Sequence, residues 1–168
     1  YASLLVLYDP LQAGHTESRA ILEECLKQPQ TATENAAGRQ VTLPLYYSPE
    51  VGPDLLSMAE IKGLLPEDVI RLHHERVYRV YAIGFAPGFA YLGQVNEQLA
   101  TARLATPRAK VPQGAVGIAD QQTAVYPSKS PGGWNLIGRC PVRILTPNAM
   151  DAPKMSVGDH VRSEPINR

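Results

Sequence analysis

The spacing of hydrophobic residues divides the chain into a short helical beginning and a long stretch of strands. Residues 3–8 predict a buried strand. A helix is predicted over residues 17–27, with apolar side chains at helical spacing and Thr16 placed to cap it. Residues 28–39 are polar and contain proline and glycine, which predicts a linker or a loop near a domain boundary. One strand and one helix are too little to fold alone, so this beginning resembles the tail of a small α/β domain.

The following segment predicts one strand and two short helices. Residues 41–47 form the strand, and Pro44 indicates an edge position or a bulge, because proline cannot donate to the sheet. One helix is expected to begin at Pro53-Asp54 and to end at Gly63 as its C-terminal cap. The second covers residues 66–74, with acidic residues in its first turn.

From residue 77 onward the pattern is one of short strands separated by turns. Strands are predicted at 78–83, 115–119, 123–126, 134–137, 142–145 and 160–162. The second and third of these form a hairpin through residues 120–122, and residues 155–159 form a turn before the last strand. Short strands with frequent glycine and proline favour a barrel or sandwich over a doubly wound parallel sheet.

Composition excludes several classes of function. The chain has 168 residues, 44% hydrophobic and 19% charged, which suits one domain with part of another. Sixteen basic residues balance sixteen acidic ones, so no charge excess favours nucleic acid or an anionic membrane as a partner. No apolar run approaches the roughly 20 residues of a membrane helix. Cys25 and Cys140 lie far apart without a CxxC spacing, which favours reduced thiols in the cytoplasm over a disulfide framework or a metal site.

The chain begins with Tyr1 rather than methionine and enters the first apolar run at once. A strand there needs neighbouring strands to pair with, so we expect the natural protein to extend upstream. No signal peptide is visible, although upstream sequence could carry one.

Three segments contain residues that could form a binding site. In the first, residues 84–93, glycines allow close approach of the backbone and Pro87 stiffens the loop. Its aromatic residues Phe85, Phe89 and Tyr91 could form one wall of a pocket. The alternative is a tight barrel corner whose aromatic side chains belong to the core.

The second segment runs from residue 107 to residue 126. Arg108 and Lys110 could bind a carboxylate or phosphate, and Gln122 could donate and accept hydrogen bonds to an amide. The alternative is a solvated basic pair and a glutamine in a turn.

The third segment, residues 130–134, contains a Pro-Gly-Gly turn and the single tryptophan, Trp134. Its exposed backbone N–H groups could hold an anion, although it matches no phosphate-loop pattern. Arg139, shortly after it, is the best candidate for an anion-binding side chain.

His73 follows Val69 by four residues and shares its inward helix face. A histidine in this position is usually a satisfied core or capping group. His73 nevertheless precedes the strand that leads into the glycine-rich loop, so it could also act as an acid or base in the same pocket.

Several known motifs are absent from the sequence. There is no Walker-type phosphate loop, no Gly-x-Ser-x-Gly elbow and no HExxH zinc motif. The surroundings of Lys154 only faintly resemble a biotin attachment sequence, because Pro153 replaces the expected flanking residue.

The order of these segments resembles one family over roughly residues 40 to 166. The resemblance rests on Tyr46-Tyr47, residues 52–55, Leu72-His73, residues 78–93, Pro107-Arg108, Val111-Pro112, residues 114–118, Gln122-Thr123, Tyr126-Pro127, residues 130–134, residues 137–139 and Gly158-Asp159. The family is that of the 5-oxoprolinase B subunit, also known as allophanate hydrolase subunit 1, which includes sporulation-kinase inhibitors. Ala90 stands where this family usually has proline.

The resemblance implies a mainly β fold, a cyclophilin-like β-barrel with short helices over residues 39–168. Residues 1–38 would be the remnant of an amino-terminal ferredoxin-like α/β domain. It also implies a cytoplasmic hydrolase component, inactive alone, that works with a cyclophilin-like C subunit and with an A subunit in the ATP-dependent opening of 5-oxoproline to glutamate. ATP would be bound with these partners, and neither metal nor biotin is expected on this chain. Cyclophilin-like architecture does not imply prolyl isomerase activity.

The site residues expected on this basis fall into two groups. The catalytic group is His73, Gln122 and Arg139. The substrate-binding group is Phe85, Pro87, Phe89, Arg108, Tyr126 and Trp134. Two other functions remain open for the family, namely a component related to allophanate hydrolase or urea carboxylase, and a non-catalytic inhibitor of a sensor histidine kinase.

Overall fold

The computed structural model describes residues 5–27, 38–145 and 155–167. The chain forms two compact units, residues 1–36 and residues 37–168. Most of the predicted linker and the segment around Lys154 lie outside the described residues.

The first unit contains helix α1, His15–Lys27, which carries an ion pair of 2.8 Å between Arg19 and Glu23 one turn apart. The helix is confirmed, but Thr16 lies inside it rather than capping it. The predicted strand over residues 3–8 is wrong for residues 5–8, which are exposed and form no strand. Among the described residues of this unit there is no second strand to pair with, and an isolated strand leaves its backbone hydrogen bonds to water.

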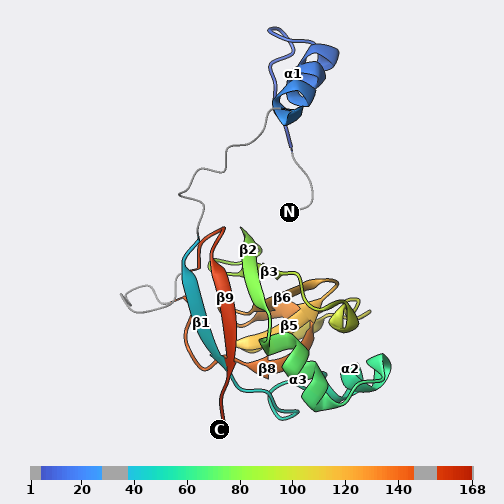
Figure 1. Ribbon diagram of the computed structural model, residues 1–168, viewed down its shortest axis with the longest axis vertical. Coiled ribbons are helices and arrows are strands. Elements are labelled where there is room, and N and C mark those ends of the chain that lie inside the picture. Colours follow the sequence, from blue (N-terminus) through green and yellow to red (C-terminus); the bar gives the residue numbers. More distant parts are fainter. Residues whose placement is uncertain (1–4, 28–37, 146–154, 168) are drawn as a thin grey trace. The chain divides into compact units, whose positions relative to one another are not determined.

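The second unit is built on a curled sheet (Figure 1). Within the described residues its order is β1 (Gln40–Leu45), β9 (His160–Pro165), β2 (Val77–Ile83), β3 (Ala90–Gly93), β6 (Gln122–Val125), β5 (Ala115–Ala119) and β8 (Asn135–Arg139). The β1–β9 pair is parallel and the other pairs are antiparallel. The ends of the sheet meet where Tyr46 and Arg139 exchange two backbone hydrogen bonds of 2.8 Å, so the sheet curls almost into a barrel.

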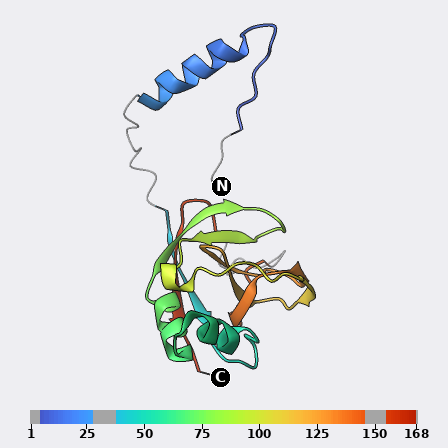
Figure 2. The same cartoon turned by 90° about the vertical axis from the view of Figure 1, so that its right-hand side faces the viewer.

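Two short helices lie together at one end of this sheet, as both ribbon views show (Figures 1 and 2). They are α2, Leu55–Lys62, and α3, Pro66–His74. Helix α2 ends at Gly63, whose φ of 64° lies in the left-handed region that glycine reaches without a Cβ clash. The start of α2 after Pro53-Asp54 and its end at Gly63 therefore agree with the sequence prediction.

The described residues also contain a small two-stranded sheet of β4 (Arg108–Val111) and β7 (Ser130–Gly132), and a 3-10 helix at Glu97–Leu99. The sequence pattern did not predict these elements. The predicted strand over residues 142–145 is wrong, because this segment follows Pro141 and pairs with no strand among the described residues. Ile144 is nevertheless buried in the core.

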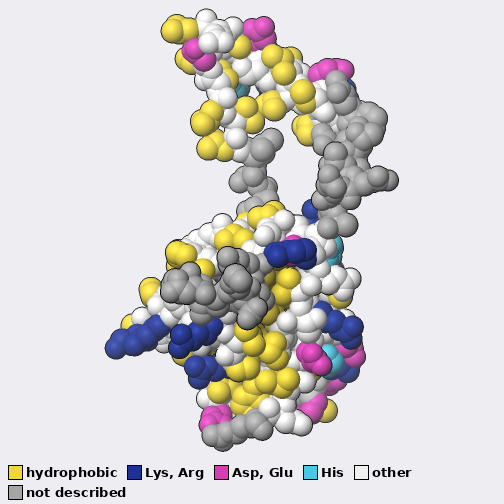
Figure 3. All heavy atoms as spheres, turned by 90° about the vertical axis from the view of Figure 1, so that its left-hand side faces the viewer, with side chains coloured by type: hydrophobic (Ala, Val, Ile, Leu, Met, Phe, Trp, Pro, Cys, Tyr) yellow, Lys and Arg dark blue, Asp and Glu magenta, His cyan; other side chains and the backbone are white. Residues whose placement is uncertain are grey.

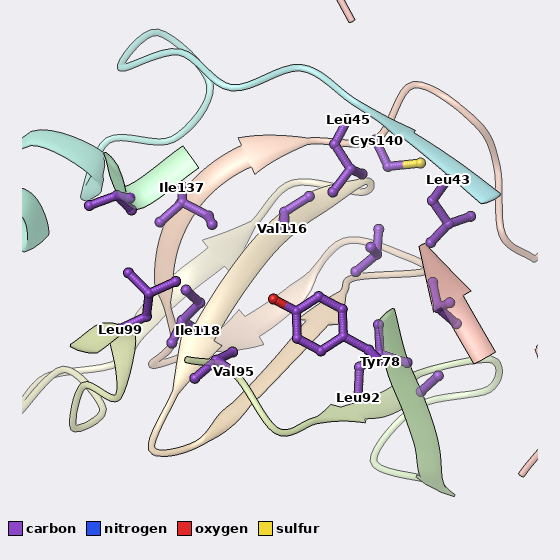
Figure 4. Packing of buried hydrophobic residues seen from close by; sticks show 14 of the residues in the cluster. Leu43, Leu45, Tyr78, Leu92, Val95, Leu99, Val116, Ile118, Ile137 and Cys140 are labelled. Atoms are coloured by element: carbon purple, nitrogen blue, oxygen red, sulfur yellow. The ribbon is translucent and has the colours of Figure 1, made fainter. Parts of the chain in front are cut away.

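Successive side chains of a strand point to opposite faces of the sheet, and each face carries a buried hydrophobic cluster. The larger fills the inside of the curled sheet, where Leu43, Leu45, Tyr78 and Ile118 point toward one another (Figure 4). Burial of each such side chain contributes about 1.5–3 kcal/mol. The smaller cluster lies on the opposite face of β5, β6 and β8, with Phe89, Tyr126 and Trp134 as its large members. The predicted mainly β architecture with short helices is confirmed.

The surface of the second unit is mixed in character. On the face shown in Figure 3, hydrophobic side chains form a band and lysine and arginine side chains gather beside it. Within the part of the chain that the structure describes, no helix has both the length and the apolar character needed to cross a membrane.

Candidate functional site

The second hydrophobic cluster opens into a pocket of about 240 Å³, here termed the aromatic pocket. Its lining residues are Phe85, Phe89, Tyr91, Arg103, Pro107, Tyr126, Pro131, Gly132, Gly133 and Trp134. Four of the predicted substrate-binding residues, Phe85, Phe89, Tyr126 and Trp134, therefore lie together. Both phenylalanines and the single tryptophan of the chain are among them.

Phe89 is the centre of the aromatic wall. Its ring packs edge-on against four others, with centroid distances of 5.3 Å to Phe85, 4.9 Å to Tyr91, 5.2 Å to Tyr126 and 5.5 Å to Trp134. Edge-to-face pairs of this kind contribute roughly 0.5–1.5 kcal/mol each beyond the area they bury. The wall is therefore held firmly while one face of the cluster stays open to a ligand.

A tight turn places the two phenylalanines. The Phe89 amide donates to the carbonyl of Ala86 at 3.0 Å, and Pro87 and Gly88 occupy the centre of this turn. Gly88 has a φ of 78°, which matches a type II turn with proline before glycine. Pro87 is exposed and is not among the lining residues, so it shapes the loop rather than contacting the pocket.

Phe85 occupies an unusual backbone conformation at the rim of the pocket. Its φ is 69° and its side chain is 62% exposed. A non-glycine residue in the left-handed region costs of order 1 kcal/mol or more, and such residues concentrate at binding sites. The fold thus retains an exposed aromatic ring at a strained position beside the pocket.

Two tyrosines, Tyr91 and Tyr126, line the pocket, and Tyr126 is the more deeply buried of the two. A Cβ at Gly132 would lie 2.4 Å from the Tyr126 hydroxyl oxygen, so glycine is required there. Burial raises the pKa of Tyr126, and the nearby charge of Arg103 acts in the opposite direction. The phenol therefore stays protonated at neutral pH and can donate a hydrogen bond.

Arg103 was missed by the sequence reasoning. Its guanidinium carbon lies 6.0 Å from the ring centroid of Trp134, within the range of a cation–π contact. Its ion pair with Asp120 is long, at 3.8 Å, and both side chains are more than half exposed, so the pair is weak. Arg103 stands in a loop without a recognisable motif, and only the fold brings it to the aromatic rings.

Arg108, predicted to bind substrate, is held by a carboxylate of the chain itself. Its guanidinium donates to Asp54 at 2.6 Å, while the other carboxylate oxygen of Asp54 accepts from the Leu136 amide at 2.6 Å. Arg108 is not among the residues that line the aromatic pocket. The pair connects the start of α2 to β4 and β8.

His73 and the aromatic pocket lie on opposite faces of β6. The Nε2 atom of His73 lies 2.8 Å from the hydroxyl of Thr123, whereas the neighbouring Ala124 belongs to the cluster around the pocket. Successive side chains of a strand point to opposite faces. His73 is 1% exposed, so the structure does not bring it to this pocket.

Both ring nitrogens of His73 have partners. The Thr123 hydroxyl donates to the Gly117 carbonyl at 3.0 Å, so it accepts from His73 Nε2. Nδ1 is then the acceptor for the Tyr47 hydroxyl at 2.7 Å. Burial, with a smaller contribution from the charge of His74, lowers the pKa of His73 to about 3. The ring is therefore a neutral core group with a fixed tautomer.

Gln122 and Arg139 also lie outside the lining of the aromatic pocket. Gln122 is 9% exposed at the start of β6, on the same face as Tyr126 by strand alternation. Arg139 ends β8, whose opposite end adjoins Trp134. At a rise of about 3.3 Å per residue, the strand separates Trp134 from Arg139 by roughly 16 Å.

The pocket offers aromatic faces, two phenols and one guanidinium. These groups suit a small, flat, partly apolar molecule that carries a negative charge and hydrogen-bond acceptors. Among the described residues, no three histidine, cysteine, aspartate or glutamate side chains gather as metal ligands.

The chain is similar in sequence to one protein family and to several named proteins. Residues 1–155 match the family model described as carboxyltransferase domain, subdomain C and D. A Bacillus subtilis protein, named as the B subunit of 5-oxoprolinase, is 44% identical over 124 residues, which make up 74% of this chain and 52% of that protein. The chain thus spans about half the length of this relative.

Two solved structures share the fold. One is a conserved uncharacterised protein from Pyrococcus horikoshii, 44% identical, with a TM-score of 0.70 over 96% of this chain and 73% of that one. The other is the urea carboxylase of Kluyveromyces lactis, 16% identical, with a TM-score of 0.66 over 95% of this chain and 17% of that one. At this low identity the second likeness shows the fold alone.

Proposed function

The chain belongs to the family of carboxyltransferase domains, subdomains C and D, and from this we propose that it is part of the B subunit of an ATP-dependent 5-oxoprolinase. That enzyme opens 5-oxoproline to glutamate. The observation that carries the proposal is the 44% identity over 124 residues to the B. subtilis protein of that name.

The aromatic pocket provides a place for such a substrate. 5-Oxoproline is a flat five-membered lactam with one carboxylate, and a pocket of about 240 Å³ suits a ligand smaller than a typical drug molecule. The ring would lie against Phe89 and Trp134, with the substrate carboxylate near Arg103. Tyr126 would donate a hydrogen bond to an oxygen of the lactam. Together these groups orient the amide and keep water from its faces.

The same pocket does not fit ATP. A triphosphate needs several cationic or backbone donors, whereas the only cationic side chain among the lining residues is Arg103. We therefore propose that ATP binds with the partner proteins, the C and A subunits, and we assign no step of phosphate transfer to this chain.

On this proposal the chain is inactive alone and works in the cytoplasm within a complex of the A, B and C subunits. Its role is to hold and orient the lactam while activation of the carbonyl is completed with the partners. Tyr126 acts as a hydrogen-bond donor rather than a base, because its raised pKa keeps the phenol protonated.

The test is a reconstitution of the full-length B subunit with its C and A partners, ATP and 5-oxoproline, in which glutamate release is measured. We expect glutamate only when all components are present. An assembled complex that releases no glutamate would contradict the proposed reaction.

A substitution then tests the pocket separately. Arg103→Gln should raise KM for 5-oxoproline roughly tenfold with kcat little changed, because the arginine would bind substrate and transition state alike. Arg71→Gln is the matched control, since Arg71 is an exposed arginine on α3 that pairs with Asp68 and Glu75. If the Arg103→Gln enzyme is active and its KM is unchanged, the substrate does not bind in this pocket. The assignment of the reaction would still stand.

A further inference from the structure

A second pocket, of about 190 Å³, lies at the far end of β8 from the aromatic pocket. Its lining residues are Gln113, Gly114, Arg139, Cys140, Pro141, Val142 and Arg143. Two of these seven residues are arginines, and none of them is aromatic or acidic. This pocket is therefore basic and has no aromatic wall, unlike the aromatic pocket.

The two arginines of this pocket are both exposed at its lining. Among the ion pairs within residues 5–27, 38–145 and 155–167, neither Arg139 nor Arg143 has a carboxylate partner. Arg108, by contrast, is held by Asp54. The charges of both arginines can therefore attract an anion that enters the pocket.

The floor of the pocket is rigid. Gly114 has a φ of 81°, and its amide donates to the Tyr126 carbonyl at 2.8 Å. The Cys140 amide donates to the Gly114 carbonyl at 2.7 Å, and the Gln113 side chain donates to the Pro127 carbonyl at 2.9 Å. The turn before β5 is thereby locked to the end of β8.

The close packing also reaches the first arginine. A Cβ at Gly114 would lie 3.5 Å from Cγ of Arg139 and 2.3 Å from the Cys140 carbonyl oxygen. The Cys140 carbonyl therefore requires glycine at this position, whereas the stem of Arg139 lies at an ordinary contact distance from the turn.

From this arrangement we propose that the pocket of Arg139 and Arg143 binds a small oxyanion, a phosphate or carboxylate group. The planar guanidinium fork donates two parallel hydrogen bonds to either group. The volume of about 190 Å³ admits one such group with a small substituent. The site is separate from the aromatic pocket, and the proposal does not rest on the 5-oxoprolinase assignment.

The experiment is calorimetric titration of the purified chain with sodium phosphate and, separately, sodium acetate, at an ionic strength held constant with sodium chloride. We expect saturable binding of at least one of the two anions, and the preferred anion identifies the group recognised. Arg139→Gln and Arg143→Gln should each weaken binding roughly tenfold, and the double variant should abolish it.

The matched control is the Arg76→Gln/Arg79→Gln double variant. It removes the same charge from two exposed arginines outside the pocket lining, Arg79 in β2 and Arg76 directly before it, and should bind like the wild type. Circular dichroism establishes that each variant is folded. The proposal is overturned if neither anion saturates the wild type, if Arg139→Gln/Arg143→Gln binds as tightly as the wild type, or if both double variants lose binding equally.

Discussion

His73 shows how a residue with catalytic potential can be reserved for structure. Its ring accepts a hydrogen bond from the Tyr47 hydroxyl and donates one to the Thr123 hydroxyl. The ring centroid lies 5.3 Å from that of Tyr78. Tyr78 in turn donates its hydroxyl to the His73 carbonyl at 2.6 Å. This network joins α3 to the inside of the sheet, and it requires the neutral imidazole because Nδ1 must accept.

The lowered pKa of His73 predicts a loss of stability on acidification. Above pH 6.5 the ring is neutral in both the folded and the unfolded chain, so it adds no pH dependence. Below that value the unfolded chain takes up a proton that the folded chain refuses until about pH 3. The slope of the free energy of unfolding approaches ~1.4 kcal/mol per pH unit well below pH 6.5, which amounts to a loss of ~2 kcal/mol between pH 7.5 and pH 5.

Urea denaturation at pH 7.5 and pH 5 measures this loss. His73→Gln should be less stable at pH 7.5 but should lose much less on acidification, whereas His74→Gln, on the same helix, should keep the full drop. An equal drop in all three proteins would show that other groups cause the pH dependence.

Gly132 is a second residue whose role can be isolated. An alanine Cβ there would lie 2.4 Å from the Tyr126 hydroxyl oxygen, and Tyr126 is only 1% exposed and cannot swing away. We expect Gly132→Ala to cost about 1–3 kcal/mol in thermal unfolding, as overpacked sites do. Tyr126→Phe in the same chain removes the oxygen and should recover part of that loss.

The control for this change is the adjacent Gly133→Ala. Its nearest neighbours would lie 3.6 Å away, an ordinary contact distance, so its melting temperature should stay close to that of the wild type. A Gly133→Ala variant as unstable as Gly132→Ala would point to the backbone of the turn rather than to the Tyr126 clash.

At the scale of elements, Asp54 joins the start of α2 to two strands. One carboxylate oxygen accepts from Arg108 on β4 and the other from the Leu136 amide on β8. Asp54→Ala would leave a largely buried arginine and a buried amide without their partner. We expect a loss of about 3 kcal/mol in the free energy of unfolding, measured with urea.

The exposed ion pair between Asp68 and Arg71 provides the control for the buried Asp54 pair. Asp68→Ala removes the carboxylate that pairs with Arg71 on α3, where both side chains are more than a third exposed. Its cost should stay below about 1 kcal/mol. Equal effects of the two changes would mean that the Asp54 pair behaves as an exposed one.

Local signals predicted the helices and most strands of the second unit because they act over a few residues. The Pro-Asp pair before α2 and Gly63 after it determine that helix without reference to the rest of the fold. β4 and β7 escaped prediction because they are short, because β7 contains Pro131, and because the two strands are defined by pairing with each other. Residues 142–145 carry a strand-like pattern, yet no partner strand among the described residues completes it.

The aromatic pocket was predictable only in part for a similar reason. Phe85 and Phe89 share one loop, and composition alone indicated a possible wall. The approach of Arg103 to Trp134, and the separation of Trp134 from Arg139, depend on long-range topology. The ion pair between Arg108 and Asp54 joins residues 54 positions apart, which no local sequence pattern can indicate.

At the scale of the whole molecule, the described residues that form the two buried clusters all belong to the second unit, from Val41 onward. Arg39, close to the start of that unit, is also held within it, since its guanidinium donates to Asp159 at 2.7 Å. Among the residues that the structure describes, the hydrophobic clusters and the Arg39–Asp159 pair therefore lie within the second unit.

This distribution predicts that residues 37–168 fold without residues 1–36. Their melting temperature should match that of the second unit in the whole chain within about 2 °C, since a loss of 1 kcal/mol would shift a unit of this size by more. Calorimetry of both chains measures it, and anion titration of the shorter chain shows whether the arginine pocket is retained. A shorter chain that melts many degrees lower would mean that residues 1–36 stabilise the barrel.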